Sequence, residues 1–338
     1  MEDSEKNKRD RLFSHSYLCR RRHKVARIAE QNWKFCSRFL RRKAPAEWRS
    51  AMKEKLKQIL ARFVFSLYHK KILKNRISVN SIEETIEHLV KSEDSLVRFG
   101  DGEIKLIAGK EIPFQKPDPA LAGRLKDILQ TEEAGLSVAL PDIFEDVSAY
   151  VEKSQSFWME HLLFHRREYN RYCCVRVYEN AFFSRPYIMY RDKTESAELF
   201  RRMKQIWENQ KIVFVEGDIS HNGVDVDLFE NAASIERIIC PSSQAWERYT
   251  EILDACRQLP KDRLMLVSLG AAGKVLTVDL HRLGYRVIDV GSLDMEYGWF
   301  CEGAAEKCRV IKHEIHTREE NEEAGYFDYL DQILTTIH

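Results

Sequence analysis

The feature that most constrains this chain is an alternation, from about residue 78 onward, between short apolar segments and longer stretches with helical spacing. Such an alternation is typical of an α/β fold with a mainly parallel sheet covered by helices. We predict strands at 95–99, 136–140, 211–215, 237–240, 264–269 and 285–290. We predict helices at about 80–92, 119–131, 145–168, 195–209, 242–257 and 273–283.

The first 77 residues differ in composition from the rest. They hold 23 Lys and Arg against 7 Asp and Glu, a net charge of +16, whereas the whole chain has a formal net charge of +1 and the remainder therefore −15. They contain no glycine and one proline, Pro45, so we predict two helices that are broken near residues 44–47. The second helix should be basic and amphipathic, because its apolar residues recur every four positions: Trp48, Met52, Leu56, Leu60 and Val64.

These patterns divide the chain into a basic, helical N-terminal extension (1–77), an α/β domain (78–316) and a closing C-terminal helix (317–338). The eight cysteines show no paired spacing, which fits a reducing compartment. No apolar run approaches the length of a membrane span, and the first residues do not resemble a secretion signal. We therefore expect a cytoplasmic protein, with peripheral attachment to the inner face of the membrane as an option for the extension.

The segment after the first long strand has the clearest chemical signature. It reads Arg-Phe-Gly-Asp-Gly-Glu, residues 98–103. Because glycine permits a compact loop, we expect the carboxylates of Asp101 and Glu103 to turn toward one point. Mg²⁺ and Mn²⁺ bind such carboxylates and complete their shell with water and phosphates, and Arg98 would add positive charge for a diphosphate. The alternative is an ordinary solvated turn.

A second polar segment follows the strand that ends near Glu216. Glycines at 217 and 223 enclose Ser220, His221 and Asn222, whose amides and side chains suit phosphate or sugar hydroxyls. For His221 the alternative is a surface histidine that only forms hydrogen bonds. Gly270, which follows another strand, is also compatible with a phosphate contact, although the Walker spacing is missing.

A third segment, residues 291–300, contains Asp294 and Glu296. A carboxylate there would serve as a general base for an acceptor hydroxyl, and Tyr297 and Trp299 would offer a face to a sugar ring. The alternative is that these aromatic side chains belong to the core. No Gly-x-Gly-x-x-Gly follows the first strand, which argues against a dinucleotide oxidoreductase.

Together these segments resemble the GT-D class of bacterial glycosyltransferases, in order from about residue 78 to about residue 312. The resemblance rests on residues 98–103, Phe183-Ser184-Arg185-Pro186-Tyr187, Glu216-Gly217, Ser220, Gly223-Val224, residues 227–232, Ile238-Ile239-Cys240-Pro241, Ser268-Leu269-Gly270, Asp294-Met295-Glu296-Tyr297 and Trp299-Phe300. It implies one Rossmann-like domain and metal-dependent transfer of a hexose from a nucleotide diphosphate sugar, most simply a UDP-sugar. The acceptor would be a glycan, a lipid-linked glycan or a glycoprotein, in surface polysaccharide or glycoprotein synthesis.

The resemblance also implies roles for individual residues. Asp101 and Glu103 fall on the family's Asp-x-Glu motif and would hold Mn²⁺ or Mg²⁺, with Arg98 or Arg185 helping to stabilise the leaving diphosphate. The general base is left open among three carboxylates, with a preference for Asp294: Glu216, Asp294 and Glu296. The donor would contact Arg98, Arg185, Ser220, His221, Asn222 and Gly270.

Two questions remain open in the sequence. The chain departs from the family pattern at His221 and Asp225, which removes positive charge near a phosphate. This departure supports the alternative of a non-catalytic nucleotide- or glycan-binding module. The partner of residues 1–77 is also open. Their charge attracts nucleic acid without specificity, but the apolar stripe favours an anionic membrane surface, and packing on the acidic domain or on a second subunit of a homo-oligomer is the third option.

Overall fold

The computed structural model describes residues 46–174 and 176–338. The chain divides into two compact units, residues 1–75 and 76–338, and each is described by itself. In the first unit, α2 (Ala46–His69) is a single helix that begins where the sequence predicts the second helix of the basic extension. The first predicted helix lies outside the described residues. Within the described part of the chain, no helix combines the length and the apolar character that crossing a bilayer requires.

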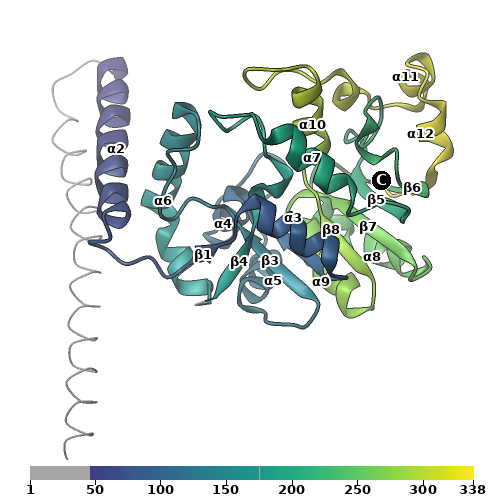
Figure 1. Cartoon of the computed structure of the whole chain (residues 1–338), viewed down its shortest axis with the longest axis horizontal. Helices are drawn as coiled ribbons and strands as arrows, with labels where there is room; N and C mark the ends of the chain where they lie inside the picture. The colour runs from purple at the N-terminus through teal and green to yellow at the C-terminus, as the bar shows by residue number, and fades with distance from the viewer. Residues whose placement is uncertain (1–45, 175) are drawn as a thin grey trace, which may run out of the picture. The chain divides into compact units, whose positions relative to one another are not determined.

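The second unit is built on a parallel sheet of nine described strands, which confirms the predicted α/β class. Their order is β1-β4-β3-β2-β8-β7-β5-β6-β9, and Figure 1 shows the central strands side by side. The strands are β1 (Ser78–Val79), β2 (Ser95–Arg98), β3 (Leu136–Leu140), β4 (Val177–Asn180), β5 (Lys211–Gly217), β6 (Ser234–Cys240), β7 (Arg263–Ser268), β8 (Arg286–Asp289) and β9 (Ile333–Thr336).

Helices cover both faces of this sheet. Right-handed crossovers between parallel strands place a helix on one face or the other according to the direction in which the chain crosses. One face carries α3 (Ile82–Lys91), α7 (Ser196–Lys204) and α10 (Leu293–Cys301), with α3 packed on α7 and Phe200 of α7 against Tyr297 of α10. The other face carries α4 (Asp101–Ile107), α5 (Pro119–Gln130), α6 (Glu152–Tyr172), α8 (Tyr249–Arg257) and α9 (Gly270–Arg282).

The central strands are buried on both faces, as expected for a parallel sheet between two helical layers. Val213 and Val215 of β5 lie with Met265 and Val267 of β7 in one apolar cluster that also includes Leu276 of α9. All five side chains are fully buried. This arrangement explains why the strands read as nearly continuous apolar runs in the sequence.

The C-terminal region differs from the prediction. Instead of one helix over 317–338, the structure has α11 (Arg318–Glu323), α12 (Phe327–Asp331) and the edge strand β9. A single helix is interrupted at Gly325, whose φ of +79° is left-handed. Beyond α12, the β-branched residues Ile333, Thr335 and Thr336 pair with β6, because the edge of β6 offers unpaired backbone groups.

His88 of α3 gives the fold a pH dependence that can be measured. Its Nδ1 lies 2.7 Å from Glu179 Oε1 and its Nε2 3.0 Å from Asp94 Oδ2. Burial disfavours its charge, but these carboxylates outweigh burial and raise the pKa of His88. A raised pKa means that the contribution of His88 to stability is complete below its ordinary pKa, about 6.5, and is lost as the pH rises through the folded-state value.

We therefore expect His88→Gln to lower the free energy of unfolding more at pH 5.5 than at pH 8.5, by about 1 kcal/mol or less because the pair is partly exposed. Urea unfolding of both proteins at the two pH values measures the difference. An equal loss at both pH values would contradict the prediction.

Candidate functional site

The polar segments that the sequence singled out come together at one edge of the sheet. They follow β2, β8, β7 and β5, which are four neighbouring strands. Because all strands are parallel, their carboxyl ends share one edge, where ligands of open α/β sheets bind. The connection after β2 leads to α4 on one face and the connection after β8 leads to α10 on the other, so the chain diverges at this point.

The Asp-x-Glu pair lies in the first turn of α4, not in the loop that the sequence suggested. Glu103 is buried, and its Oε2 accepts the backbone N–H of Gly100 at 2.7 Å in a capping arrangement. Asp101 is partly exposed and its Oδ2 lies 2.5 Å from the Lys105 Nζ one turn further on. Carboxylates are favoured at a helix N-terminus by the exposed N–H groups there, which explains why this short segment becomes helical.

Arg98 belongs to a buried ionic network at the end of β2. Its guanidinium binds Asp289, at the end of β8, and donates to Ala181 O at 3.0 Å and to Ser184 Oγ. Lys274 of α9 lies 2.7 Å from Asp289 and 3.9 Å from Glu103. Burial opposes the charge of Asp289, but Lys274 and Arg98 outweigh burial and hold the pKa of that carboxyl below its usual range. Arg98 therefore fixes β2 to β8, and its donors are engaged by protein groups.

Gly291, directly after β8, is required by this network. Its φ is +50°, and a Cβ placed there would lie 1.7 Å from Arg98 Nη2. We expect Gly291→Ala to lower the free energy of unfolding by about 1–3 kcal/mol more than Gly284→Ala. Gly284 is the matched control, because its φ is +84° but nothing lies within 4 Å of its Cβ position. Equal losses in urea unfolding would mean that the contact with Arg98 costs nothing.

Arg185 is the cationic centre of the site. Burial lowers the pKa of this guanidinium and the charge of Arg98 acts in the same direction, while Glu296, Asp101 and Glu103 oppose them. The carboxylates of α4 and α10 are therefore electrostatic neighbours of the same arginine. Its Nη2 donates to Ser292 Oγ at 3.3 Å, directly before α10. The structure thus brings together Asp101, Glu103, Arg185 and Glu296 from three separate segments.

Glu296 is the carboxylate in this group with a buried oxygen that lacks a hydrogen-bond partner among the described residues. Its Oε1 accepts the backbone N–H groups of Tyr187 at 3.0 Å and Ile188 at 2.7 Å. Its Oε2 is buried and has no hydrogen-bond partner among the described residues. Burial raises the pKa of Glu296, and the two amides and Arg185 only partly oppose this effect. A buried carboxylate with one unsatisfied oxygen and a raised pKa is suited to accept a proton.

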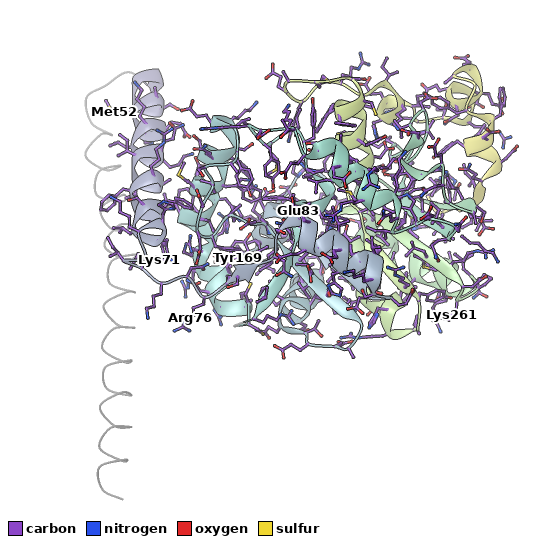
Figure 2. The ribbon with its side chains drawn as sticks, viewed as in Figure 1. Met52, Lys71, Arg76, Glu83, Tyr169 and Lys261 are labelled. Carbon is purple, nitrogen blue, oxygen red and sulfur yellow. The ribbon has the colours of Figure 1, made fainter. Side chains whose placement is uncertain are left out.

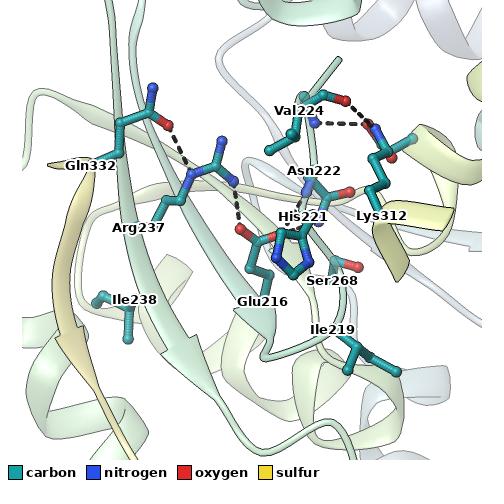
Figure 3. A network of polar contacts seen from close by, with 12 residues as sticks. Glu216, Ile219, His221, Asn222, Val224, Arg237, Ile238, Ser268, Lys312 and Gln332 are labelled. Atoms are coloured by element: carbon teal, nitrogen blue, oxygen red, sulfur yellow. Dashed lines mark hydrogen bonds and ion pairs between the residues drawn. The ribbon is translucent and has the colours of Figure 1, made fainter. Parts of the chain in front are cut away.

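Glu216, by contrast, has both oxygens engaged inside the protein (Figure 3). Its Oε1 forms an ion pair with Arg237 at 2.5 Å, and its Oε2 accepts the backbone N–H of Asn222 at 2.9 Å together with the Asn222 side chain. Glu216 is fully buried, and Arg237 is held in turn by Gln332 at 2.8 Å. This arrangement makes Glu216 and Asn222 anchors of the loop after β5.

Asp294 is likewise engaged. It accepts the N–H of Gly223 at 2.7 Å, lies 2.8 Å from Lys312 Nζ and 3.2 Å from His313 Nε2. Burial opposes its charge, but His313 and Lys312 outweigh burial and lower its pKa. Of the three carboxylates left open by the sequence, Glu296 therefore has the geometry of a base, whereas Asp294 and Glu216 fix the loop.

The remaining predicted residues are spread along the same edge. Ser220 is half-buried in the loop, and its N–H donates to Gly217 O at 2.8 Å. His221 is fully buried, with a hydrogen bond of 2.9 Å to Asn321 and a stacking contact to Tyr329, and burial lowers its pKa. Its neutral ring therefore packs on the C-terminal segment. Gly270 is exposed at the start of α9, beside open space, where a helix N-terminus favours anions.

Sequence reasoning missed several residues of the site because their partners are distant in the chain. Asp289 lies 191 positions from Arg98, Arg237 is 21 positions from Glu216, and Lys312 is 18 positions from Asp294. Each is a charged residue beside or within an apolar strand or short turn. That placement is the one signal in the sequence that marks a charge for burial.

The carboxylates fit one kind of metal site. Among the described residues, no group of three or more His, Cys, Asp and Glu side chains is arranged to hold an ion. A metal bound by protein side chains alone therefore does not fit. Asp101 Oδ1 and Glu103 Oε1 form no hydrogen bond to a described residue, so they fit a divalent ion whose other ligands are water and phosphate oxygens, as Mg²⁺ and Mn²⁺ allow.

Comparison with known proteins gives consistent matches. The family model described as "Glycosyltransferase GT-D fold" matches residues 96–319. A relative from Streptococcus gordonii named "Probable glycosyl transferase Gly" is 43% identical over 247 residues, which cover 73% of this chain and 36% of the relative. "Glycosyltransferase GlyD" from Streptococcus pneumoniae is 41% identical over 267 residues, 77% of this chain and 33% of the relative. The chain thus spans about a third of the length of these relatives.

Solved structures agree with the sequence matches. One is described as showing that "the highly conserved domain of unknown function 1792 has a distinct glycosyltransferase fold", and another as "a new glycosyltransferase (DUF1792) from Streptococcus sanguinis". Both are 37% identical to this chain and superpose with a TM-score of 0.72 over 78% of it, covering 96% and 100% of their own lengths.

Proposed function

This chain belongs to the glycosyltransferase GT-D fold family, and from that premise we propose that it transfers a sugar from a nucleotide diphosphate sugar, in the presence of Mn²⁺ or Mg²⁺, to an acceptor hydroxyl. The observation that carries the proposal is the convergence of Asp101 and Glu103, Arg185 and the unpartnered oxygen of Glu296 at the carboxyl edge of the sheet. The site therefore pairs a cation for a diphosphate with a base for a hydroxyl.

Each residue has a role in the proposed reaction. Asp101 and Glu103 would hold the divalent ion, which acts as a Lewis acid on the leaving diphosphate. Arg185 would bind the diphosphate, and the exposed N-terminus of α9 at Gly270 offers a further anion contact at the same edge of the sheet. Glu296 Oε2 would take the proton as the acceptor oxygen bonds to the anomeric carbon and the bond from that carbon to the phosphate oxygen breaks.

A donor panel tests this function. The purified chain is incubated with UDP- and dTDP-sugars, with and without Mn²⁺, and release of the nucleoside diphosphate is measured with glycan acceptors and with water. We expect turnover of at least one donor that requires the metal and that is lost in Asp101→Asn. Asp127→Asn, an exposed aspartate of α5, is the control. Donor binding without any release would contradict transfer and favour the alternative of a binding module.

For residues 1–77 we propose an anionic membrane surface as the partner. In the described part of this segment, Ile59 and Phe63 lie one turn apart on α2 and are 64% and 59% exposed, among Lys and Arg residues. Apolar side chains between basic ones suit an interface with anionic lipid. Co-sedimentation of the full chain with vesicles of phosphatidylglycerol should fall in Ile59→Asp/Phe63→Asp, whereas unchanged sedimentation would contradict the proposal.

A further inference from the structure

A pocket of about 340 Å³ lies beside the site, at the carboxyl ends of β3 and β4. Its walls come from the first turns of α3 and α7, from Asp142 after β3, and from the segment that includes Pro186 and Tyr190. Figure 2 shows Glu83, one of its lining residues, near the start of α3. The volume lies at the lower end of the range for small-ligand sites.

The segment that forms one wall of this pocket also holds the candidate base. Glu296 accepts the N–H groups of Tyr187 and Ile188, which belong to the same short segment as Pro186 and Tyr190 in the pocket wall. The charge of Glu296 also contributes, after burial and together with Asp142 and Glu83, to raising the pKa of Tyr190. Glu296 is therefore joined to the pocket wall through this segment, and its buried Oε2 has no hydrogen-bond partner among the described residues.

The polar groups of the pocket define its ligand. Four carboxylates line it, none in an ion pair with a described residue: Glu83, Asp142, Asp192 and Glu195. Ionised carboxylates only accept hydrogen bonds, so the ligand must supply donors, and a diphosphate would be repelled. No three of the carboxylates in the described part of the chain converge on a metal position. A ring with hydroxyl donors on several sides matches such a dispersed set of acceptors better than an ion does.

The walls are rigid before a ligand arrives. Tyr150 donates to Asp142 O at 2.6 Å and packs edge-to-face on Tyr190, with ring centroids 5.0 Å apart. Ser196 Oγ donates to Pro186 O at 2.7 Å, and this hydrogen bond joins the start of α7 to the wall segment that contains Pro186 and Tyr190. Preformed walls reduce the entropy that is lost when a ligand binds.

Resting on the proposed function, we propose that this pocket binds a neutral sugar unit of the acceptor and presents it to Glu296. The donor, in contrast, would bind at Arg185. The guanidinium of Arg185 suits the anionic donor, and the carboxylate-lined pocket suits a neutral polyol. The charge of the two regions thus assigns the two substrates of one reaction to different places.

The test uses the full chain and methyl glycosides of neutral hexoses and N-acetylhexosamines as probes, with binding followed by saturation-transfer NMR. We expect at least one glycoside to bind, and its affinity to fall about tenfold or more in Glu83→Ala/Glu195→Ala, the size expected for lost hydrogen bonds to charged acceptors. Glu198→Ala is the matched control. Glu198 lies in the first turn of α7, three residues after Glu195, but it pairs with Arg201 and does not line the pocket.

Three results would overturn the proposal: no glycoside binds, the double variant binds as the wild type does, or Ca²⁺ or spermidine occupies the pocket in place of the glycosides. Donor hydrolysis in water keeps this test separate from that of the proposed function. If the double variant hydrolyses donor normally while its acceptor KM rises and kcat is unchanged, both proposals stand. If donor hydrolysis is absent in the wild type but glycosides bind at the pocket, the transfer proposal fails and the binding site remains.

Discussion

Replacing Glu296 with Gln is expected to lower the rate of sugar transfer by about 10²–10⁴-fold, the range that a positioned general base contributes. Glutamine keeps an oxygen for the N–H groups of Tyr187 and Ile188, so the segment should remain in place. What is lost is the unpartnered oxygen that would accept the proton. Transfer rates at saturating donor measure the loss, and the thermal midpoint checks that the fold is intact.

The pH profile gives Glu296 a second signature. Because its pKa is raised above the ordinary glutamate value, kcat/KM of the wild type should fall as the pH drops through that raised pKa, since the base must be deprotonated. This acid limb should vanish in Glu296→Gln. Glu302→Gln, an exposed residue at the end of α10, is the control and should keep it. A wild-type rate in Glu296→Gln would rule out this residue as the base.

Asp289→Asn should cause the largest loss of stability, about 3–5 kcal/mol, because it leaves Arg98 and Lys274 as buried cations without their shared anion. Urea unfolding measures the loss. Asp254→Asn is the control: this aspartate pairs with Arg257 at 3.2 Å but is 59% exposed, so its removal should cost less than about 1 kcal/mol.

If Asp289→Asn fails to fold, Asp289→Asn/Lys274→Met still tests the argument. Removing one of the two stranded cations should restore part of the stability, and the double variant should be recovered in soluble form. A double variant that is no more stable than Asp289→Asn would show that the charges are not what makes this position sensitive. The wild type should also lose the contribution of Asp289 on acidification, because a lowered pKa stabilises the fold only while the pH stays above it.

The sheet could be predicted well because its strands are buried on both faces. The prediction for 136–140 coincides with β3, and those for 95–99 and 264–269 exceed β2 and β7 by one residue at the C-terminal end. The strands that were missed are β1, β4 and β9, which lie at or near the edges of the sheet. β4 lies between β3 and the two-residue edge strand β1, and its sequence Val-Tyr-Glu-Asn carries no continuous apolar signal.

For the site, the sequence predicts where the polar segments lie but not what each side chain contacts. The positions can be predicted because each polar segment comes directly after a buried strand. The hydrogen bonds and ion pairs of each side chain cannot be predicted in this way, because they depend on partners that only the fold brings close. Asp294 and Glu296 stand two positions apart in one helical turn. Asp294 nevertheless pairs with Lys312 and His313, whereas Glu296 accepts two backbone N–H groups and keeps one oxygen without a partner among the described residues.

The order of the strands also determines when the site can exist. Residues 78–180 form β1, β4, β3 and β2, and residues 211–336 form the other five strands, with β2 and β8 joined at Leu96 and Ile288. Asp101 and Glu103 come from the first half, and Lys274 and Glu296 from the second. During synthesis, β2 must therefore wait as an open edge until β8 has been made. Neither half contains all of these residues, so the candidate site is complete only when the two halves pack together.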